Sequence, residues 1–299
     1  MRARQYEKHI HEDIAMKSNI MKQFDLNGTV AVITGGGGAL CGTMARGLAG
    51  LGVKVAILDL SLEQAKKQEK AIVDEGGEAR AWACNVLDES QIKKVNDEIC
   101  DVWGTPDFLI NGAGGNDPRG TTTNEYFEQG DLGKEGITTF FDLDLKGFSF
   151  VFDLNFIGTF LPTKVFSKGM AEKKKGAIVN ISSMAALAPL TKVAAYSAAK
   201  SAVANFTSWL AVHFSHTGIR VNALAPGFFM TEQLRFLHID QKTGEYTPRA
   251  KKVIAHTPMG RYGEPEELVG TVVWLLSDAS KFVTGIVVPI DGGYSSYSI

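Results

Sequence analysis

The sequence has few cysteines, little net charge and no long apolar run, and each of these absences excludes a class of protein. Its three cysteines, Cys41, Cys84 and Cys100, are odd in number and lack metal-ligand or C-x-x-C spacing, so we expect reduced, mostly buried thiols of a cytoplasmic protein and no metal site. The net charge of −2 gives no electrostatic sign of nucleic-acid binding. No apolar run approaches the roughly 20 residues that span a membrane, and we expect no secretory signal.

Two common nucleotide-binding patterns are also missing from the glycine-rich stretch ITGGGGALCG, residues 33–42. Leu40 and Cys41 stand where G-x-G-x-x-G would need its third glycine, and Thr43 stands where a P-loop has its lysine. The stretch still lies between an apolar run and a helical pattern, the context in which backbone N–H groups and a helix N-terminus bind phosphate. Taken alone, it also fits a tight turn without a ligand.

The rest of the chain alternates apolar runs with helical patterns. We expect strands at 29–34, 54–60, 79–86, 107–114, 176–183, 219–227 and 285–293, and helices at 40–51, 61–75, 88–102, 154–172, 194–216 and 264–277. Continuous apolar strands between helices predict a parallel sheet covered on both faces. Right-handed crossovers make this a doubly wound, Rossmann-type α/β fold of about seven strands. We expect one domain over residues 27–299 after a polar N-terminal extension, residues 1–26.

Two segments, 115–152 and 228–263, are too long to be simple connections. Both follow strand ends, and ligands of open α/β sheets bind beyond the carboxyl ends of the strands. We therefore expect these segments to cover a substrate.

The second predicted strand ends at Asp59, 24 residues after Gly35. An acidic residue there can accept hydrogen bonds from both ribose hydroxyls of a dinucleotide and repels a 2′-phosphate. Leu60 and Ser61 offer no arginine to offset that repulsion. The pattern favours NAD(H) over NADP(H), whereas an ordinary loop acid remains the plain alternative.

A phenol and an ammonium group are paired in YSAAK, residues 196–200. Tyr196 and Lys200 share one helix face at i and i+4, so the positive charge is expected to lower the pKa of the phenol. That would suit a general acid/base near neutral pH. Ser183 ends the fifth strand thirteen residues earlier, and the intervening loop can return it to Tyr196. The spacing alone also fits a helix-start tyrosine beside a surface lysine.

Together these motifs resemble the short-chain dehydrogenase/reductase family over about residues 26–299. The order is the glycine-rich turn, Asp59, NGAG (111–114), Asn155, Ser183, YSAAK and PG (226–227). The resemblance implies that Tyr196 protonates a carbonyl oxygen during hydride delivery, and that Lys200 lowers its pKa and holds the nicotinamide ribose. It also implies that Ser183 binds the substrate oxygen and that Asn155 supports a water-linked proton path.

The resemblance further implies NAD(H) as cofactor. The expected contacts are Gly35, Gly37, Ala39, Leu40, Asp59, Asn85, Val86, Asn111, Ala113, Gly114, Tyr196, Lys200, Pro226, Gly227, Phe229 and Thr231. Two departures stand out. Ala39 and Cys41 replace the later glycines of the family pattern T-G-x-x-x-G-x-G, and Asn85 replaces an aspartate expected at the adenine.

Longer stretches, such as VNISSMAALAPLTKVAAYSAAK and HTPMGRYGEPEEL, resemble members of the family that reduce a keto-sugar acid. Its carboxylate would need a cation, and an arginine would bind it best. The candidates are Lys192, which lies between Ser183 and Tyr196, and Arg119, Arg235 and Arg261. Another keto-uronate, a sugar, a polyol and a non-catalytic NAD-binding regulator remain open. The family implies a homo-oligomer, usually a tetramer and sometimes a dimer.

Overall fold

Seven parallel strands form one sheet in the computed structural model, which describes residues 19–298, so most of the predicted extension 1–26 lies outside the described residues. The order is β3-β2-β1-β4-β5-β6-β7, which confirms the doubly wound Rossmann-type fold, with its switch point between β1 and β4. The strands are β1 (Val30–Thr34), β2 (Lys54–Asp59), β3 (Ala79–Ala83), β4 (Phe108–Asn111), β5 (Gly176–Ile181), β6 (Ile219–Pro226) and β7 (Val287–Ile290).

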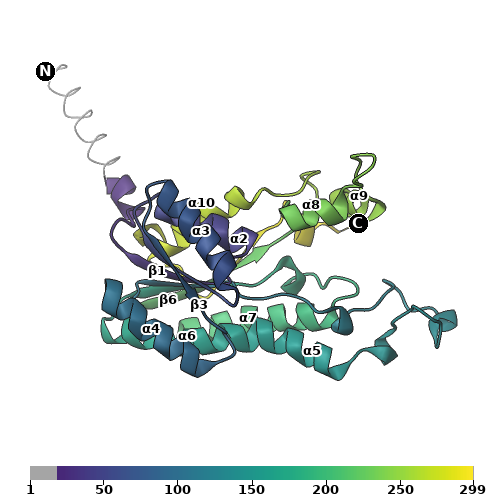
Figure 1. Cartoon of the computed structure of the whole chain (residues 1–299), viewed down its shortest axis with the longest axis horizontal. Coiled ribbons are helices and arrows are strands. Elements are labelled where there is room, and N and C mark those ends of the chain that lie inside the picture. The colour runs from purple at the N-terminus through teal and green to yellow at the C-terminus, as the bar shows by residue number, and fades with distance from the viewer. Residues whose placement is uncertain (1–18, 299) are drawn as a thin grey trace, which may run out of the picture.

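Helices cover both faces of this sheet (Figure 1). One layer contains α2 (Ala39–Ala49), α3 (Leu62–Asp74) and α10 (Val269–Leu276), and the other contains α4 (Glu89–Trp103), α6 (Gly158–Glu172) and α7 (Ala194–His213). Alternate residues of β1 face opposite layers: Ala31 and Ile33 belong to one apolar cluster, whereas Val30 and Val32 belong to the other. The strands are therefore buried on both faces, as their uninterrupted apolar runs predict.

Helix ends follow local capping chemistry. The Ser61 hydroxyl accepts a hydrogen bond from the Gln64 amide at 3.4 Å, and the Asp88 carboxylate accepts from the amides of Ser90 and Gln91. Gly76, just after α3, has a φ of +85°, which glycine adopts without strain. These ends lie within a residue or two of their predicted positions.

One predicted helix begins too late. The helix expected from Leu154 starts nine residues earlier with α5 (Leu145–Phe152), continues through a π-helical turn (Asp153–Ile157) and becomes α6. Asp144 starts it by accepting hydrogen bonds from the amides of Lys146 and Gly147. The end of segment 115–152 is therefore helical, and the helix carries Asn155 in its π turn.

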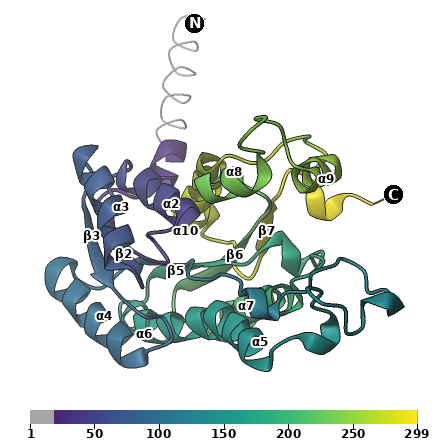
Figure 2. The same ribbon diagram turned by 45° about the vertical axis from the view of Figure 1, so that its right-hand side comes forward.

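Segment 228–263 contains two short helices that the sequence did not predict, α8 (Glu232–His238) and α9 (Pro248–His256). They pack over a separate small apolar cluster that includes Met230, Ala250, Val253 and Tyr262. Figure 2 shows this α8–α9 segment beside the end of the sheet where β6 and β7 lie. Across residues 19–298, none of the helices has the length and apolar character needed to cross a bilayer.

Candidate active site

The carboxyl ends of the central strands meet around a cleft of about 920 Å³. The register places Thr34 of β1 opposite both Leu58 of β2 and Asn111 of β4, so the loops after these strands converge. The cleft is lined by several residues predicted to contact the cofactor: Gly35, Gly37, Ala39, Leu40, Asp59, Gly114 and Thr231.

The glycine-rich turn is held close to the loop after β4. Gly35 has a φ of +64°, and a Cβ there would lie 2.8 Å from the Ala113 Cα, so only glycine fits. The Thr34 hydroxyl accepts hydrogen bonds from the amides of Gly112 and Ala113 at 3.1 and 3.2 Å. The backbone at both predicted binding loops is thus fixed relative to the cleft.

Asp59 is positioned by backbone donors on both of its oxygens. Its Oδ2 accepts from the Gly37 amide and its Oδ1 from the Ser61 amide, each at 3.0 Å. The carboxylate is therefore attached to the glycine-rich turn itself, where it adds negative charge to one side of the cleft.

Cys41 fills the space behind this turn. Its side chain is buried, and a Cβ added to Gly112 would overlap the Cys41 Sγ. Burial raises the pKa of the thiol to about 12, although Lys200 acts in the opposite direction. The thiol therefore stays neutral and packs against the Gly112 backbone, while Ala39 lines the cleft.

Asn155 and Lys200 meet at the backbone of the loop after β4. The Asn155 amide nitrogen donates to the carbonyls of Gly115 and Val151, each at 2.7 Å, and its Oδ1 accepts from the Gly115 amide at 3.3 Å. A Cβ on Gly114 would lie 2.5 Å from the Asn155 Oδ1 and 3.2 Å from the Lys200 Nζ. The structure thus brings these two predicted catalytic side chains to Gly114.

Tyr196 lies on the same face of α7 as Lys200, whose Nζ is 5.6 Å from the centre of the phenol ring. The Ser183 hydroxyl lies close enough to the phenol to lower its pKa. The Ser183 hydroxyl also accepts from the Ala185 amide at 3.1 Å and so starts a short 3-10 helix. Ser183, Tyr196 and Lys200 therefore form one constellation at the end of β5.

The prediction that the pKa of Tyr196 is lowered is wrong for the chain without cofactor or substrate. Burial raises the pKa of the phenol, and the nearby Ser183 hydroxyl offsets this only in part. Lys200 does not reverse it, because its ammonium donates to the Ile181 carbonyl at 2.8 Å and is itself buried. Desolvation lowers the pKa of Lys200 to about 8.

Other predicted cofactor residues lie around the cleft rather than on its wall. Asn111 is buried, and its amide donates to Thr163 Oγ1 and Asn180 Oδ1 at 2.8 Å, which ties β4 to α6 and β5. Asn85 Oδ1 accepts from the Leu87 amide at 3.0 Å. The buried Val86 lies against Gly158 of α6.

The β6 end approaches β7 and the α8–α9 segment. Gly227, which follows Pro226, has no room for a Cβ because the Asp291 Cα would lie 2.6 Å away. The Phe229 ring is buried against Gly263, so its side chain belongs to the core. Thr231 caps α8 through the Leu234 amide at 3.2 Å.

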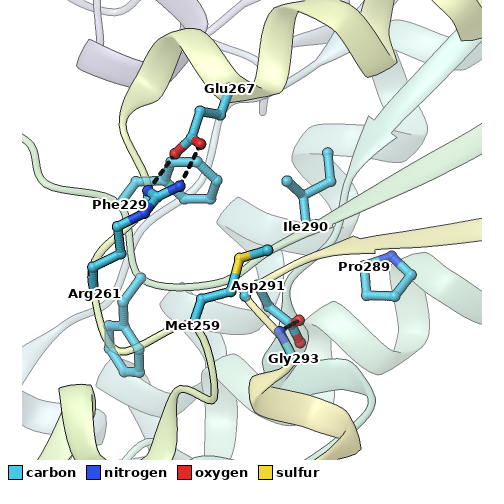
Figure 3. Close-up of a pocket in the computed structure, with 11 residues that line it drawn as sticks. Phe229, Met259, Arg261, Glu267, Pro289, Ile290, Asp291 and Gly293 are labelled. Atoms are coloured by element: carbon cyan, nitrogen blue, oxygen red, sulfur yellow. Dashed lines mark hydrogen bonds and ion pairs between the residues drawn. The ribbon is translucent and has the colours of Figure 1, made fainter.

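The predicted substrate cations are dispersed. Arg119 makes two hydrogen bonds to Asp117 at 3.0 and 2.8 Å. Arg261 makes two to Glu267 at 2.7 Å, beside the cavity of Figure 3. Lys192, with a φ of +73°, lines a cavity next to α7, and Arg235 lies exposed on α8. Arg119 and Arg261 therefore already have carboxylate partners.

Sequence reasoning missed one wall of the cleft. Gln64, Lys67 and Gln68 line it from α3, and a Cβ on Gly42 would overlap the Gln68 amide. The sequence could have indicated this wall. Lys67 and Gln68 come three and four residues after Gln64, so all three lie on one face of the helix that follows Asp59. Over residues 19–298, no cluster of three His, Cys, Asp or Glu side chains could hold a metal ion.

The chain matches known oxidoreductases over nearly its full length. A family model described as enoyl-(acyl carrier protein) reductase matches residues 39–295. An uncharacterized oxidoreductase of Haemophilus influenzae is 50% identical over 281 residues, which is 94% of this chain and 98% of that protein. UxuB, an uncharacterized oxidoreductase of Bacillus subtilis, is 50% identical over 92% of this chain and 97% of that protein.

Solved structures agree with this assignment. An NAD-bound structure from Haemophilus influenzae, provisionally named a D-mannonate oxidoreductase, is 50% identical and superposes with a TM-score of 0.87 over 92% of this chain and 97% of that one. NAD⁺-bound xylitol dehydrogenase is 32% identical, with a TM-score of 0.77 over 89% of this chain and 99% of that one. With these matches, the parallel sheet and the Ser183–Tyr196–Lys200 constellation, the chain belongs to the short-chain dehydrogenase/reductase family.

Proposed function

We propose that this chain is an NAD(H)-dependent oxidoreductase that interconverts a keto-sugar acid and its hydroxy acid. The reaction that fits best is D-fructuronate plus NADH to D-mannonate plus NAD⁺. The observation that carries the proposal is the likeness to the NAD-bound structure provisionally named a D-mannonate oxidoreductase, at 50% identity over nearly the whole chain. A polyol is the second candidate, because the xylitol and D-threitol dehydrogenases are also relatives.

The residues present fit a dinucleotide. The cleft has glycine backbone at the turn before α2, and Asp59 is positioned to accept ribose hydroxyls. When bound, NADH supplies the hydride. In our proposal the Ser183 hydroxyl binds the substrate carbonyl oxygen, and the Tyr196 phenol donates its proton to that oxygen. In our proposal Lys200 and Asn155, which meet at Gly114, then return a proton to the phenolate that remains.

Further features of the proposal come from the family resemblance. We propose that segments 115–152 and 228–263 cover the substrate, and that the enzyme is a cytoplasmic homo-oligomer, with a tetramer favoured over a dimer. The exposed Trp209 and Phe282 are apolar surface of the kind that subunit contacts bury.

The activity is tested by NADH absorbance with D-fructuronate, its isomer D-tagaturonate, D-fructose and D-xylulose, each with NADH and with NADPH. We expect the highest kcat/KM for D-fructuronate with NADH. A higher value for a neutral ketose would favour the polyol candidate. No turnover with any of the four would support the non-catalytic reading.

Replacing Asp59 should change the choice of cofactor. We expect Asp59→Ser to lower kcat/KM for NADH about 10- to 100-fold, because charge-assisted hydrogen bonds to the ribose are lost. The ratio of NADPH to NADH activity should rise, because the negative charge that repels a 2′-phosphate is gone. Asp101→Ser, an exposed position on α4, serves as the control. An unchanged ratio would show that Asp59 does not select the cofactor.

A further inference from the structure

A second cavity, of about 190 Å³, lies where the α8–α9 segment meets the loop between Ser183 and Tyr196. Leu190 and Val193 of that loop line it, and Val193 comes three residues before Tyr196. Phe228, which follows Gly227 at the end of β6, forms another side. The cavity thus adjoins the loop that leads from β5 to Tyr196 and the end of β6, and it shares no lining residue with the cleft at the glycine-rich turn.

Helix α9 presents three basic side chains to this cavity: Arg249, Lys252 and His256. Their spacing of three and four residues places them on one helix face. Val253 lines the cavity with them, whereas Ala250 is buried in the local apolar cluster. The Thr247 hydroxyl caps the helix by accepting from the Ala250 amide at 3.3 Å, which fixes the start of the turn that holds Arg249.

The charges in this cavity are unequal. Lys252 is paired with Glu125, the carboxylate that lines the same cavity. Arg249 has no ion pair within the part of the chain that the structure describes, unlike Arg119 and Arg261. The cavity therefore holds two permanent cations, Arg249 and Lys252, against the single carboxylate of Glu125, whose pKa both cations lower.

Arg249 lies close to polar aromatic groups. Its charge lowers the pKa values of Tyr294 and Tyr262, against the larger effect of burial on each. The Tyr294 ring, which also lines the cavity, packs edge-on against Phe228 with their centres 5.6 Å apart. Of the two phenols only that of Tyr294 lines the cavity, since the Tyr262 hydroxyl is bonded to His238. A guanidinium and a phenol in one cavity are suited to a ligand that has both a carboxylate and hydroxyl groups.

We propose that Arg249 binds the carboxylate of the sugar-acid substrate and so selects anionic over neutral ketoses. The inference rests on the proposed function, since it assumes a keto-sugar acid as substrate. In this proposal α9 supplies the cation that binds the carboxylate at one end of the substrate. The carbonyl, at another position of the same substrate, then lies at the Tyr196 phenol.

The test compares wild type, Arg249→Gln, Arg249→Lys and Lys251→Gln with D-fructuronate and D-fructose. Lys251 is the matched control, since it is an exposed cation on the same helix that pairs with Glu245 and does not line the cavity. We expect Arg249→Gln to raise the KM for D-fructuronate about 10- to 100-fold, because a charge-assisted, bidentate contact is lost. Its activity with D-fructose and its NADH affinity should stay within about twofold of wild type, and Arg249→Lys should recover part of the loss.

The outcomes separate the two proposals. If wild type turns over D-fructuronate and Arg249→Gln behaves like Lys251→Gln, the assignment of Arg249 fails and the proposed function stands. An equal loss for D-fructuronate and D-fructose would also overturn it, because a structural defect affects both substrates. If wild type reduces D-fructose but not D-fructuronate, both the proposed function and the role of Arg249 are wrong.

Discussion

Tyr196→Phe is expected to lower kcat for D-fructuronate reduction by about 10²- to 10⁴-fold, the usual contribution of a positioned general acid. The phenol is the proposed proton donor and its pKa responds to the nearby Ser183, and phenylalanine keeps the ring while removing the proton. The affinity for NADH should change little, because the cleft is lined mainly by the glycine-rich turn, Asp59 and α3. Steady-state rates and NADH fluorescence titration measure the two quantities separately.

The control for this change is Tyr297→Phe, at a half-exposed tyrosine near the C-terminus. It should retain wild-type kcat. If Tyr196→Phe keeps full activity, the proton comes from another group and the proposed mechanism fails. If it loses NADH binding to the same degree as activity, Tyr196 holds the cofactor rather than transferring the proton.

Lys200→Met is expected to abolish turnover and to remove a pH-dependent stability term. The pKa of Lys200 lies near 8 in the folded protein, against an ordinary value of 10.5. Below pH 8 the lysine is protonated in both states, so burial of its charge lowers the free energy of unfolding in full. Between pH 8 and 10.5 only the unfolded chain binds the proton, so the free energy of unfolding rises with pH.

The shift of roughly 2.5 pH units corresponds to about 3 kcal/mol. The free energy of unfolding of wild type, minus that of Lys200→Met, should therefore rise by about 3 kcal/mol from pH 8 to 10.5. Urea unfolding of both proteins across this range measures the difference, and other titrating groups cancel. A difference that stays flat would mean that Lys200 keeps an ordinary pKa in the folded protein.

The sheet could be predicted because its signal is local. Runs such as VAVIT and KVAILD can be buried on both faces only in a covered parallel sheet, and the caps at Ser61 and Asp88 mark helix starts in three or four residues. The order of the motifs identified the family because most of them follow strand ends, whereas Asn155 and YSAAK lie on helices.

The α8–α9 segment could not be predicted in the same way. Its helices are seven and nine residues long, too short to show a clear apolar period. They are held by contacts with other parts of the segment, such as the 2.6 Å hydrogen bond between His238 of α8 and Tyr262, which follows α9. The raised pKa of Tyr196 also depends on packing. The partners of Arg119 and Arg261, by contrast, are only two and six residues away in the sequence. Arg249 was not among the four cations that the sequence singled out, because its place at the cavity depends on how α9 packs.

The π-helical turn at Asp153–Ile157 sets the direction in which the side chains before it point around the axis of the long helix. A π turn accommodates one extra residue, so α5 and α6 are offset by about 100° from the phase of a single continuous α-helix. Removing one residue from this turn would preserve a helix of ordinary geometry but rotate everything before it. Asn155 could then keep its place beside Gly115 only if α5 and segment 115–152 turned with it. Insertions and deletions are thus far less tolerable here than substitutions, although the turn itself contains neither glycine nor proline.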